Sequence, residues 1–183
     1  MATLEKAKTL EEKRAALIIK YRNMTVDSVE KGEDNVIIYR LSKGDEKYLM
    51  QILLDLKTIG IAYIRELRDK IEAEGVDGGI IVGDGKYTYS ARSNAPEMSI
   101  ELIPKSLPTF DIFEHALVPL HEILSKEERD SIAEKYHAEP YQFPWVKASD
   151  PISIIIGANP GDVVRVIQKS ETAGRYEGYR YVV

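Results

Sequence analysis

The order of apolar and polar residues predicts helices that alternate with strands in the first part of the chain. Apolar side chains recur at steps of three and four between Thr9 and about Asn23, and again over residues 58–74, which is typical of amphipathic helices. Short β-rich runs lie between and after them, at residues 35–41, 47–54, 79–82 and 98–103. Helices interleaved with strands predict an α/β domain.

Capping residues and glycines mark the ends of these elements. Thr9-x-x-Glu12 is a capping box, in which the hydroxyl and the carboxylate each accept from a backbone amide of the first turn. Residues 42–45 (Ser-Lys-Gly-Asp) separate two β-rich runs and predict an antiparallel hairpin, because glycine tolerates a positive φ. Gly75 is expected to end the second helix. The wholly apolar run 79–82 predicts a central strand.

Two prolines within five residues, Pro104 and Pro108, predict a domain boundary, with one domain at 1–108 and a second at 109–183. In the second domain, a capping box at Ser125 begins a helix that extends to about residue 136. Asp150-Pro151 predicts a short helix that Gly157 ends. Strands are expected at 163–167 and 175–183, which makes this a small mixed α/β domain.

The last predicted strand separates its side chains between two faces. Tyr179, Tyr181 and Val183 share one face, and Arg180 and Val182 share the other. A strand at a chain end often lies at a sheet edge, where a partner can pair with it by strand addition.

Composition narrows the class of function. The chain has 183 residues, 44% of them hydrophobic and 30% charged, and no cysteine, which excludes disulfides, thiolate catalysis and cysteine-ligated zinc. Its net charge is −5. Neither predicted domain carries the basic excess typical of an autonomous DNA-binding domain, so a protein partner fits better. With neither a signal-peptide pattern nor an apolar run of about 20 residues, we expect an intracellular, soluble protein without a membrane partner.

One segment carries a family resemblance. Residues 150–183 contain, in order, an Asp-Pro helix, a Gly-Asp-Val-Val strand, Ser-Glu-Thr-Ala-Gly-Arg-Tyr, and Tyr-Arg. This order resembles the C-terminal signature of the fifth-subunit family, whose members belong to the archaeal and eukaryotic RNA polymerases. Residues 113–124 (FEHALVPLHEIL) resemble the family's His-x-Leu-Val-Pro-x-His element. Ala116 and Trp145 depart from the family pattern, which usually has a glutamate and an arginine there.

The resemblance implies a non-catalytic structural subunit of DNA-directed RNA polymerase. Its C-terminal domain would dock on the largest subunit, within a complex that also holds the other subunits. The residues that the resemblance implicates in docking surround the turn before the last strand and lie within that strand: Ser170, Glu171, Thr172, Gly174, Arg175, Tyr176, Tyr179 and Arg180. The implied location is the cytoplasm of an archaeon, the nucleus of a eukaryote, or a viral factory or virion.

The first domain resembles, more loosely, the N-terminal jaw domain of the eukaryotic subunits, which has a restriction-endonuclease-like fold. Its best matching pieces are residues 76–82 (VDGGIIV) and Thr88-x-Ser90-Ala91. A jaw domain would lie near downstream duplex DNA. Lys86, Arg92 and Lys105 are the candidate phosphate contacts.

Two alternatives remain open. A transcription regulator or paralogue could reuse the docking domain. A magnesium-dependent nuclease would need an Asp and an (Asp/Glu)-x-Lys on adjacent strands, and Asp84-Gly85-Lys86 formally fits, with Asp77 or Asp34 as the first acid. Asp-Gly is also a frequent turn dipeptide. His115, His121 and His137 lack metal-ligand spacing, so neither a metal, a cofactor nor a catalytic residue is expected.

Overall fold

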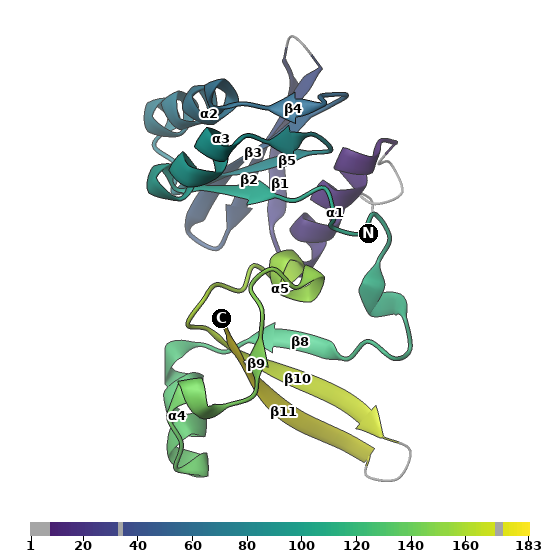
Figure 1. Ribbon diagram of the computed structural model, residues 1–183, viewed down its shortest axis with the longest axis vertical. Helices are drawn as coiled ribbons and strands as arrows, with labels where there is room; N and C mark the ends of the chain where they lie inside the picture. The colour runs from purple at the N-terminus through teal and green to yellow at the C-terminus, as the bar shows by residue number, and fades with distance from the viewer. Residues whose placement is uncertain (1–7, 33–34, 171–173) are drawn as a thin grey trace. The chain divides into compact units, whose positions relative to one another are not determined.

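The computed structural model describes residues 8–32, 35–170 and 174–183 (Figure 1). The chain divides into two compact units, residues 1–110 (unit 1) and residues 111–183 (unit 2). Each unit has its own sheet and its own core. No helix among the described residues is long and apolar enough to cross a membrane.

Unit 1 is built on a five-stranded sheet with the order β1-β2-β3-β5-β7. The strands are β1 (Thr25–Lys31), β2 (Val36–Lys43), β3 (Glu46–Leu53), β5 (Gly78–Gly83) and β7 (Ile100–Ile103). Strands β1, β2 and β3 pair antiparallel, and β3, β5 and β7 pair parallel. Two short strands, β4 (Thr58–Ile59) and β6 (Lys86–Tyr87), pair with each other outside this sheet.

Helices cover both faces of this sheet (Figure 1). α1 (Leu10–Tyr21) packs against β3 and β5. α2 (Ile61–Glu74) covers the other face, where its three buried side chains join a core with Leu49 and Leu53 of β3. The short α3 (Tyr89–Asn94) packs beside α2, and the 3-10 turn η1 (Pro96–Met98) leads into β7. The mixed α/β architecture confirms the fold class expected from the sequence.

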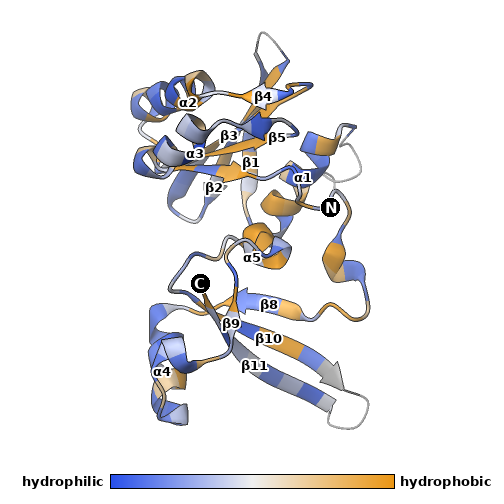
Figure 2. Ribbon diagram, viewed as in Figure 1, coloured by the Kyte–Doolittle hydropathy of each residue, from blue (hydrophilic) through white to orange (hydrophobic). Residues whose placement is uncertain are grey.

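Most expected elements are present, with shifts at their ends. The Thr9 capping box begins α1, and the β2–β3 hairpin turns at Gly44, whose φ is 61°. Gly75 ends α2 at a φ of 63°. β5 is buried along its whole length and lies between β3 and β7, as a central strand should. Figure 2 shows hydrophobic residues concentrated in the strands of this sheet. The second helix begins at Ile61 rather than at 58, because Gly60 is its extended N-cap.

One strand of unit 1 has no counterpart in the sequence analysis. β1 reads Thr-Val-Asp-Ser-Val-Glu-Lys, and six of its seven side chains are exposed. The strand lies at the sheet edge, where its backbone pairs with β2 across a bulge between Val26 and Ser28. Because the composition of β1 is polar, its sequence does not form a β-rich apolar run that would predict a strand.

Unit 2 contains a four-stranded sheet with the order β8-β10-β11-β9. The strands are β8 (Leu120–Ile123), β9 (Trp145–Val146), β10 (Val163–Ser170) and β11 (Gly174–Val182). The helices are α4 (Lys126–Tyr136) and α5 (Pro151–Ile156), with 3-10 turns η2 (Ile112–Glu114) and η3 (Pro140–Gln142). The capping box at Ser125 and the Asp150-Pro151 start of α5 are both confirmed.

The two faces of the β10–β11 ribbon hold two small cores. Tyr179 and Tyr181 contribute to the first, with Phe143 and Val163, and Ile132 of α4 packs against it. Val182 contributes to the second, with Ile156 of α5. The division of side chains predicted for the last strand, tyrosines on one face and Val182 on the other, is therefore confirmed.

A buried polar side chain interrupts the core of unit 1. Gln51 of β3 has no exposed surface and pairs in register with Ile38 on one side and Ile81 on the other. Neither its amide nitrogen nor its oxygen has a hydrogen-bond partner within the part of the chain that the structure describes. A buried amide without a partner loses its hydration, which destabilises the fold.

Gln51→Met should therefore increase the free energy of unfolding, by about 1–3 kcal/mol, because it keeps the volume and removes the two polar atoms. Chemical denaturation followed by circular dichroism measures this change. Gln168→Met at an exposed position of β10 is the matched control and should change stability by no more than about 0.5 kcal/mol. A loss of stability in Gln51→Met would show that the amide makes a favourable buried contact.

Candidate docking edge and basic edge

Within the described part of the chain, the β11 strand has a free edge along most of its length. β9 pairs with β11 only at Tyr181 and Val182, and β8 pairs with β10 rather than with β11. Residues 174–180 of β11 therefore have a described strand neighbour on one side only, β10 (Figure 1). An edge of this kind presents unpaired backbone groups to a partner.

The existing hydrogen bonds show which backbone groups point outward. The amides of Tyr181 and Val183 donate to Pro144 and Val146 on the β9 side, whereas the amide of Val182 donates to Asp162 on the β10 side. In an antiparallel strand, the backbone groups of successive residues point alternately to the two sides. Because the β10–β11 register has no bulge, the same alternation continues along the rest of β11. The N–H and C=O groups of Arg175, Glu177 and Tyr179 consequently face the free edge.

Side chains on both faces of this edge are accessible. On one face Arg175 forms an ion pair with Glu177 at 3.1 Å, and the Arg175 side chain is 65% exposed. On the other face Tyr176 is exposed and its ring lies over Gly178, where a Cβ would be 3.5 Å from the ring. Arg180 lies beyond it and donates from Nη1 to the carbonyl oxygen of Tyr179 at 3.0 Å.

The structure brings together only part of the docking set that the sequence predicted. Arg175, Tyr176 and Arg180 lie along the free edge of β11, and Gly174 begins the strand with a φ of 69°. Tyr179 belongs to the core, where its ring lies 6.0 Å from the ring of Phe143. Ser170 is the last residue of β10, and Glu171 and Thr172 fall outside the described residues.

An exposed aromatic pair lies at the end of the free edge. Trp145, the first residue of β9, is 69% exposed, and its indole N–H donates to the carbonyl oxygen of Tyr141 at 3.0 Å. Tyr141 belongs to η3 and is also exposed. Because Trp145 and Tyr181 are register partners, Trp145 lies on the same face of the sheet as the tyrosine core.

The three histidines belong to different segments of unit 2. His121 of β8 is half-buried, its Nδ1–H donates to the carbonyl oxygen of Pro119 at 2.8 Å, and its ring meets the Phe113 ring edge-on. Burial lowers the pKa of His121. His115 accepts from the amide of Leu117, and His137 ends α4 in the left-handed conformation.

In unit 1, charged residues gather where the parallel strands end. Parallel strands have their carboxyl ends at one edge of a sheet, which is where ligands bind in open α/β folds. There, Asp55 follows β3, Asp84 follows β5 and Lys105 follows β7. A cavity of about 600 Å³ lies at this edge, lined by Lys8, Thr9, Leu10, Glu11, Asp55, Leu56, Lys57, Asp84 and Lys105. We call this region the basic edge of unit 1.

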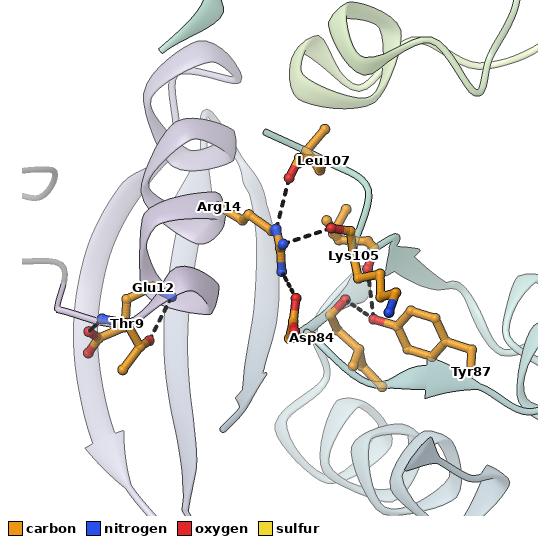
Figure 3. A network of polar contacts seen from close by, with 9 residues as sticks. Thr9, Glu12, Arg14, Asp84, Tyr87, Lys105 and Leu107 are labelled. Carbon is orange, nitrogen blue, oxygen red and sulfur yellow. Dashed lines mark hydrogen bonds and ion pairs between the residues drawn. The ribbon is translucent and has the colours of Figure 1, made fainter. Parts of the chain in front are cut away.

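A buried arginine organises the basic edge (Figure 3). Arg14 of α1 donates from Nε to the carbonyl oxygen of Leu107 at 2.9 Å and from Nη2 to that of Lys105 at 2.7 Å. Its Nη1 lies 2.9 Å from Oδ1 of Asp84. The Arg14 side chain is 6% exposed, so it holds α1, the bend after β5 and the segment after β7 together from inside. The sequence analysis did not single out this residue.

A second buried contact joins the parallel strands. The Tyr87 hydroxyl lies 3.1 Å from the carbonyl oxygen of Ile81 in β5 and 2.9 Å from that of Ile103 in β7 (Figure 3). Burial raises the pKa of Tyr87, so the hydroxyl keeps its proton and can donate.

Two of the predicted DNA contacts lie near this edge. Lys105 lines the cavity, and Lys86 of β6 pairs in register with Thr58 and donates its amide to the Lys57 carbonyl oxygen. Lys57, which the sequence analysis did not name, therefore joins them. Arg92 is exposed in the last turn of α3, the helix that follows β6.

The acids considered for a nuclease centre do not come together. Asp77 precedes β5 and Asp84 follows it, and the strand between them spans about 20 Å. Asp77 accepts from the amide of Lys47, and Asp84 is paired with Arg14. Asp34 falls outside the described residues. Across the ranges that the structure describes, no cluster of three or more His, Cys, Asp or Glu side chains is suited to holding a metal ion. The described residues therefore offer no fitting set of ligands for the divalent metal of a restriction nuclease.

Fold and sequence together define a two-part chain, a restriction-endonuclease-like unit followed by an RNA polymerase subunit domain. Residues 9–106 match the family described as "Restriction endonuclease", and residues 110–182 match "RNA polymerase Rpb5, C-terminal domain". The chain therefore belongs to the restriction endonuclease family in unit 1 and to the Rpb5/Rpo5 family in unit 2.

Three relatives in the second family each match about 40% of this chain. DNA-directed RNA polymerase subunit Rpo5 of Pyrococcus abyssi is 53% identical over 74 residues, which cover 40% of this chain and 90% of the relative. The Rpo5 of Thermococcus kodakarensis is 51% identical over the same coverage, and that of Methanococcoides burtonii is 46% identical over 74 residues, 40% of this chain and 95% of the relative.

Two solved structures resemble this chain only remotely. A protein of unknown function is 14% identical with a TM-score of 0.41, covering 54% of this chain and 59% of that chain. The DNA modification-dependent restriction endonuclease AspBHI is 12% identical with a TM-score of 0.28, covering 57% and 36%. The family assignment of unit 1 rests on its sequence match.

Arg14→Met should lower the free energy of unfolding by about 2–4 kcal/mol, because it leaves two carbonyl oxygens and the Asp84 carboxylate without their donor. Chemical denaturation measures the change. Arg68→Met is the matched control, since Arg68 forms an exposed i,i+4 pair with Glu72 that contributes about 0.5 kcal/mol or less. Equal effects of the two substitutions would contradict the role given to Arg14.

Proposed function

We propose that the chain is a non-catalytic structural subunit of a multisubunit DNA-directed RNA polymerase. Unit 2 docks on the largest subunit, and unit 1 forms the lower jaw near downstream duplex DNA. The observation that carries this proposal is the identity of 53% between unit 2 and a named polymerase subunit, across 90% of that subunit's length. Identity at this level, over nearly the whole of that subunit, favours the same kind of assembly.

The free edge of β11 supports docking through unit 2. Arg175, Tyr176 and Arg180 lie on it, with accessible backbone groups beside them. Backbone pairing gives affinity, and side chains on the two faces give specificity. Once its ion pair with Glu177 is broken, the Arg175 guanidinium can donate several hydrogen bonds in one plane. Tyr176 contributes a rigid ring.

The basic edge supports a positioning, non-cutting role for unit 1 beside DNA. Lys57, Lys86 and Lys105 can contact phosphates, and such contacts position a protein on DNA without carrying sequence information. Unit 1 has no strong positive charge, so these contacts are weak in the free chain and gain from attachment to the polymerase, which supplies a high local concentration. The separation of Asp77 from Asp84 supports a jaw that holds a duplex without cleaving it.

A transcription regulator or paralogue that reuses the docking domain is the second candidate. It is favoured by one observation: the Rpo5 relatives match only 40% of this chain, and that match spans about nine tenths of their own length. Unit 1 is an addition to such a subunit. A regulator would occupy the docking position only in a fraction of polymerase molecules.

Affinity purification of the tagged chain from its native source should recover the large polymerase subunits in equal amounts. A fragment of residues 111–183 should recover them equally well, because relatives of nearly this length exist as complete subunits. Unit 1 alone, residues 1–110, is the control and should recover none. Recovery of other proteins without polymerase would favour the regulator instead.

Replacing Lys57, Lys86 and Lys105 together by alanine should weaken binding of the assembled polymerase to downstream duplex. It should also reduce the slope of log affinity against log salt concentration, by roughly 0.9 for each phosphate that is no longer neutralised. Fluorescence anisotropy over a salt series measures both. Alanine at Lys31, Lys43 and Lys70 gives the same charge change elsewhere on unit 1 and should leave the slope unaltered. Arg92→Ala is tested beside them, and an unchanged slope removes Arg92 from the set.

A further inference from the structure

The free edge of β11 has the hydrogen-bonding groups for one more strand, and its register can be specified. We propose that an extended segment of a partner polypeptide adds to β11 opposite Arg175 and Glu177, as a fifth strand of the unit 2 sheet. This inference rests on the proposed function, under which the segment belongs to a large polymerase subunit.

The alternating direction of the backbone groups along β11 determines which residues can pair with an added strand. The amides and carbonyls of Tyr176 and Gly178 are directed to β10, so pairing with a new strand leaves them undisturbed. Those of Arg175 and Glu177 are directed outward and can make four hydrogen bonds with an extended segment. Such a segment must carry no proline where its own amides pair.

Two features set where the added strand ends. Arg180 already donates to the carbonyl oxygen of Tyr179, so this outward acceptor is occupied at 3.0 Å. Beyond it the neighbouring position is filled by Pro144, whose carbonyl oxygen accepts from the Tyr181 amide, and then by β9. η3 also packs against β11. The open stretch therefore lies between the start of β11 and Tyr179.

The aromatic pair Tyr141 and Trp145 gives the end of the added strand a surface to pack on. Both side chains are exposed, and the hydrogen bond from the indole N–H to the Tyr141 carbonyl oxygen ties the Trp145 ring to the backbone of η3. Exposed tryptophan with a fixed geometry is characteristic of residues that dominate binding energy at interfaces. An apolar side chain of the partner, at the end of its strand, fits this surface.

The opposite edge of the sheet is a poorer site. β8 is four residues long, follows Pro119 and is followed closely by the Ser125 N-cap of α4. The amide of Leu124 is directed to Val163 of β10, so by alternation only His121 and Ile123 of this strand face outward. That edge gives a matched control within the same sheet.

The test uses the tagged full-length chain and the yield of large polymerase subunits that it recovers from its native source. Glu177→Pro removes one outward amide and should reduce the yield at least about tenfold, as expected for a central interface contact. Glu177→Ala, which removes only the side chain, and Ile123→Pro, on the β8 edge, should retain the yield within about twofold. An undiminished yield with Glu177→Pro overturns the proposal.

Hydrogen exchange supplies a readout that needs no variant. In the free chain the amides of Tyr176 and Gly178 should exchange slowly and those of Arg175 and Glu177 quickly. In the purified polymerase all four should be slow, and fast exchange at Glu177 there contradicts strand addition. If the wild-type chain recovers no polymerase, the proposed function itself fails. If the free chain instead forms dimers that Glu177→Pro abolishes, the occupant is a second copy, and the proposal is also wrong.

Discussion

The guanidinium of Arg14 is the contact on which the arrangement of unit 1 depends. It lies inside the protein and donates to three oxygens that come from two different places in the sequence, Asp84 and the segment 105–107. Burying an arginine is unfavourable unless its donors are satisfied, and here each of its three named contacts is 2.9 Å or shorter. The result is a fixed position for α1, for the bend after β5, and for the segment that leads out of the unit.

This contact also bears on what unit 1 can do. The acid that a nuclease would need after β5 is Asp84, and Arg14 neutralises it from within the fold. The same edge carries Lys57, Lys86 and Lys105, which are suited to phosphate rather than to metal. A fold of the restriction endonuclease family thus carries lysines at its carboxyl edge, beside an Asp84 carboxylate that is already paired with Arg14. This combination supports the proposed role of unit 1, which is to hold a duplex without cutting it.

In unit 2 the main constraint is that backbone hydrogen-bonding groups alternate in direction along β11. The β10–β11 pairing without a bulge fixes which residues face the two cores and which amides face outward. Tyr179 and Val182 take core positions on opposite faces, and this leaves Arg175, Tyr176 and Arg180 on an edge that no strand of the described chain covers. The proposed docking role follows from this edge together with the identity to Rpo5 subunits.

Local signals in the sequence predicted much of this fold. The capping boxes at Thr9 and Ser125, the hairpin at Gly44 and the apolar run of β5 each carry their own physical cause within a few residues. What depends on distant partners was missed. β1 is polar and is a strand only because β2 pairs with it, and in the sequence Arg14 does not differ from a solvated helical arginine. The docking residues came from family resemblance, yet which amides face outward could be decided only from the observed pairing.

The central claim is that this chain is a stoichiometric subunit of the polymerase, with unit 1 as an added jaw. The most direct measurement is the mass of intact polymerase, purified through its largest subunit from the native source and analysed as an assembled complex. The account predicts one copy of this chain, with units 1 and 2 both present, in every polymerase molecule. Complexes that instead carry a shorter Rpo5 subunit, with this chain absent or in a small fraction, would contradict it and identify the chain as a paralogue with a regulatory role.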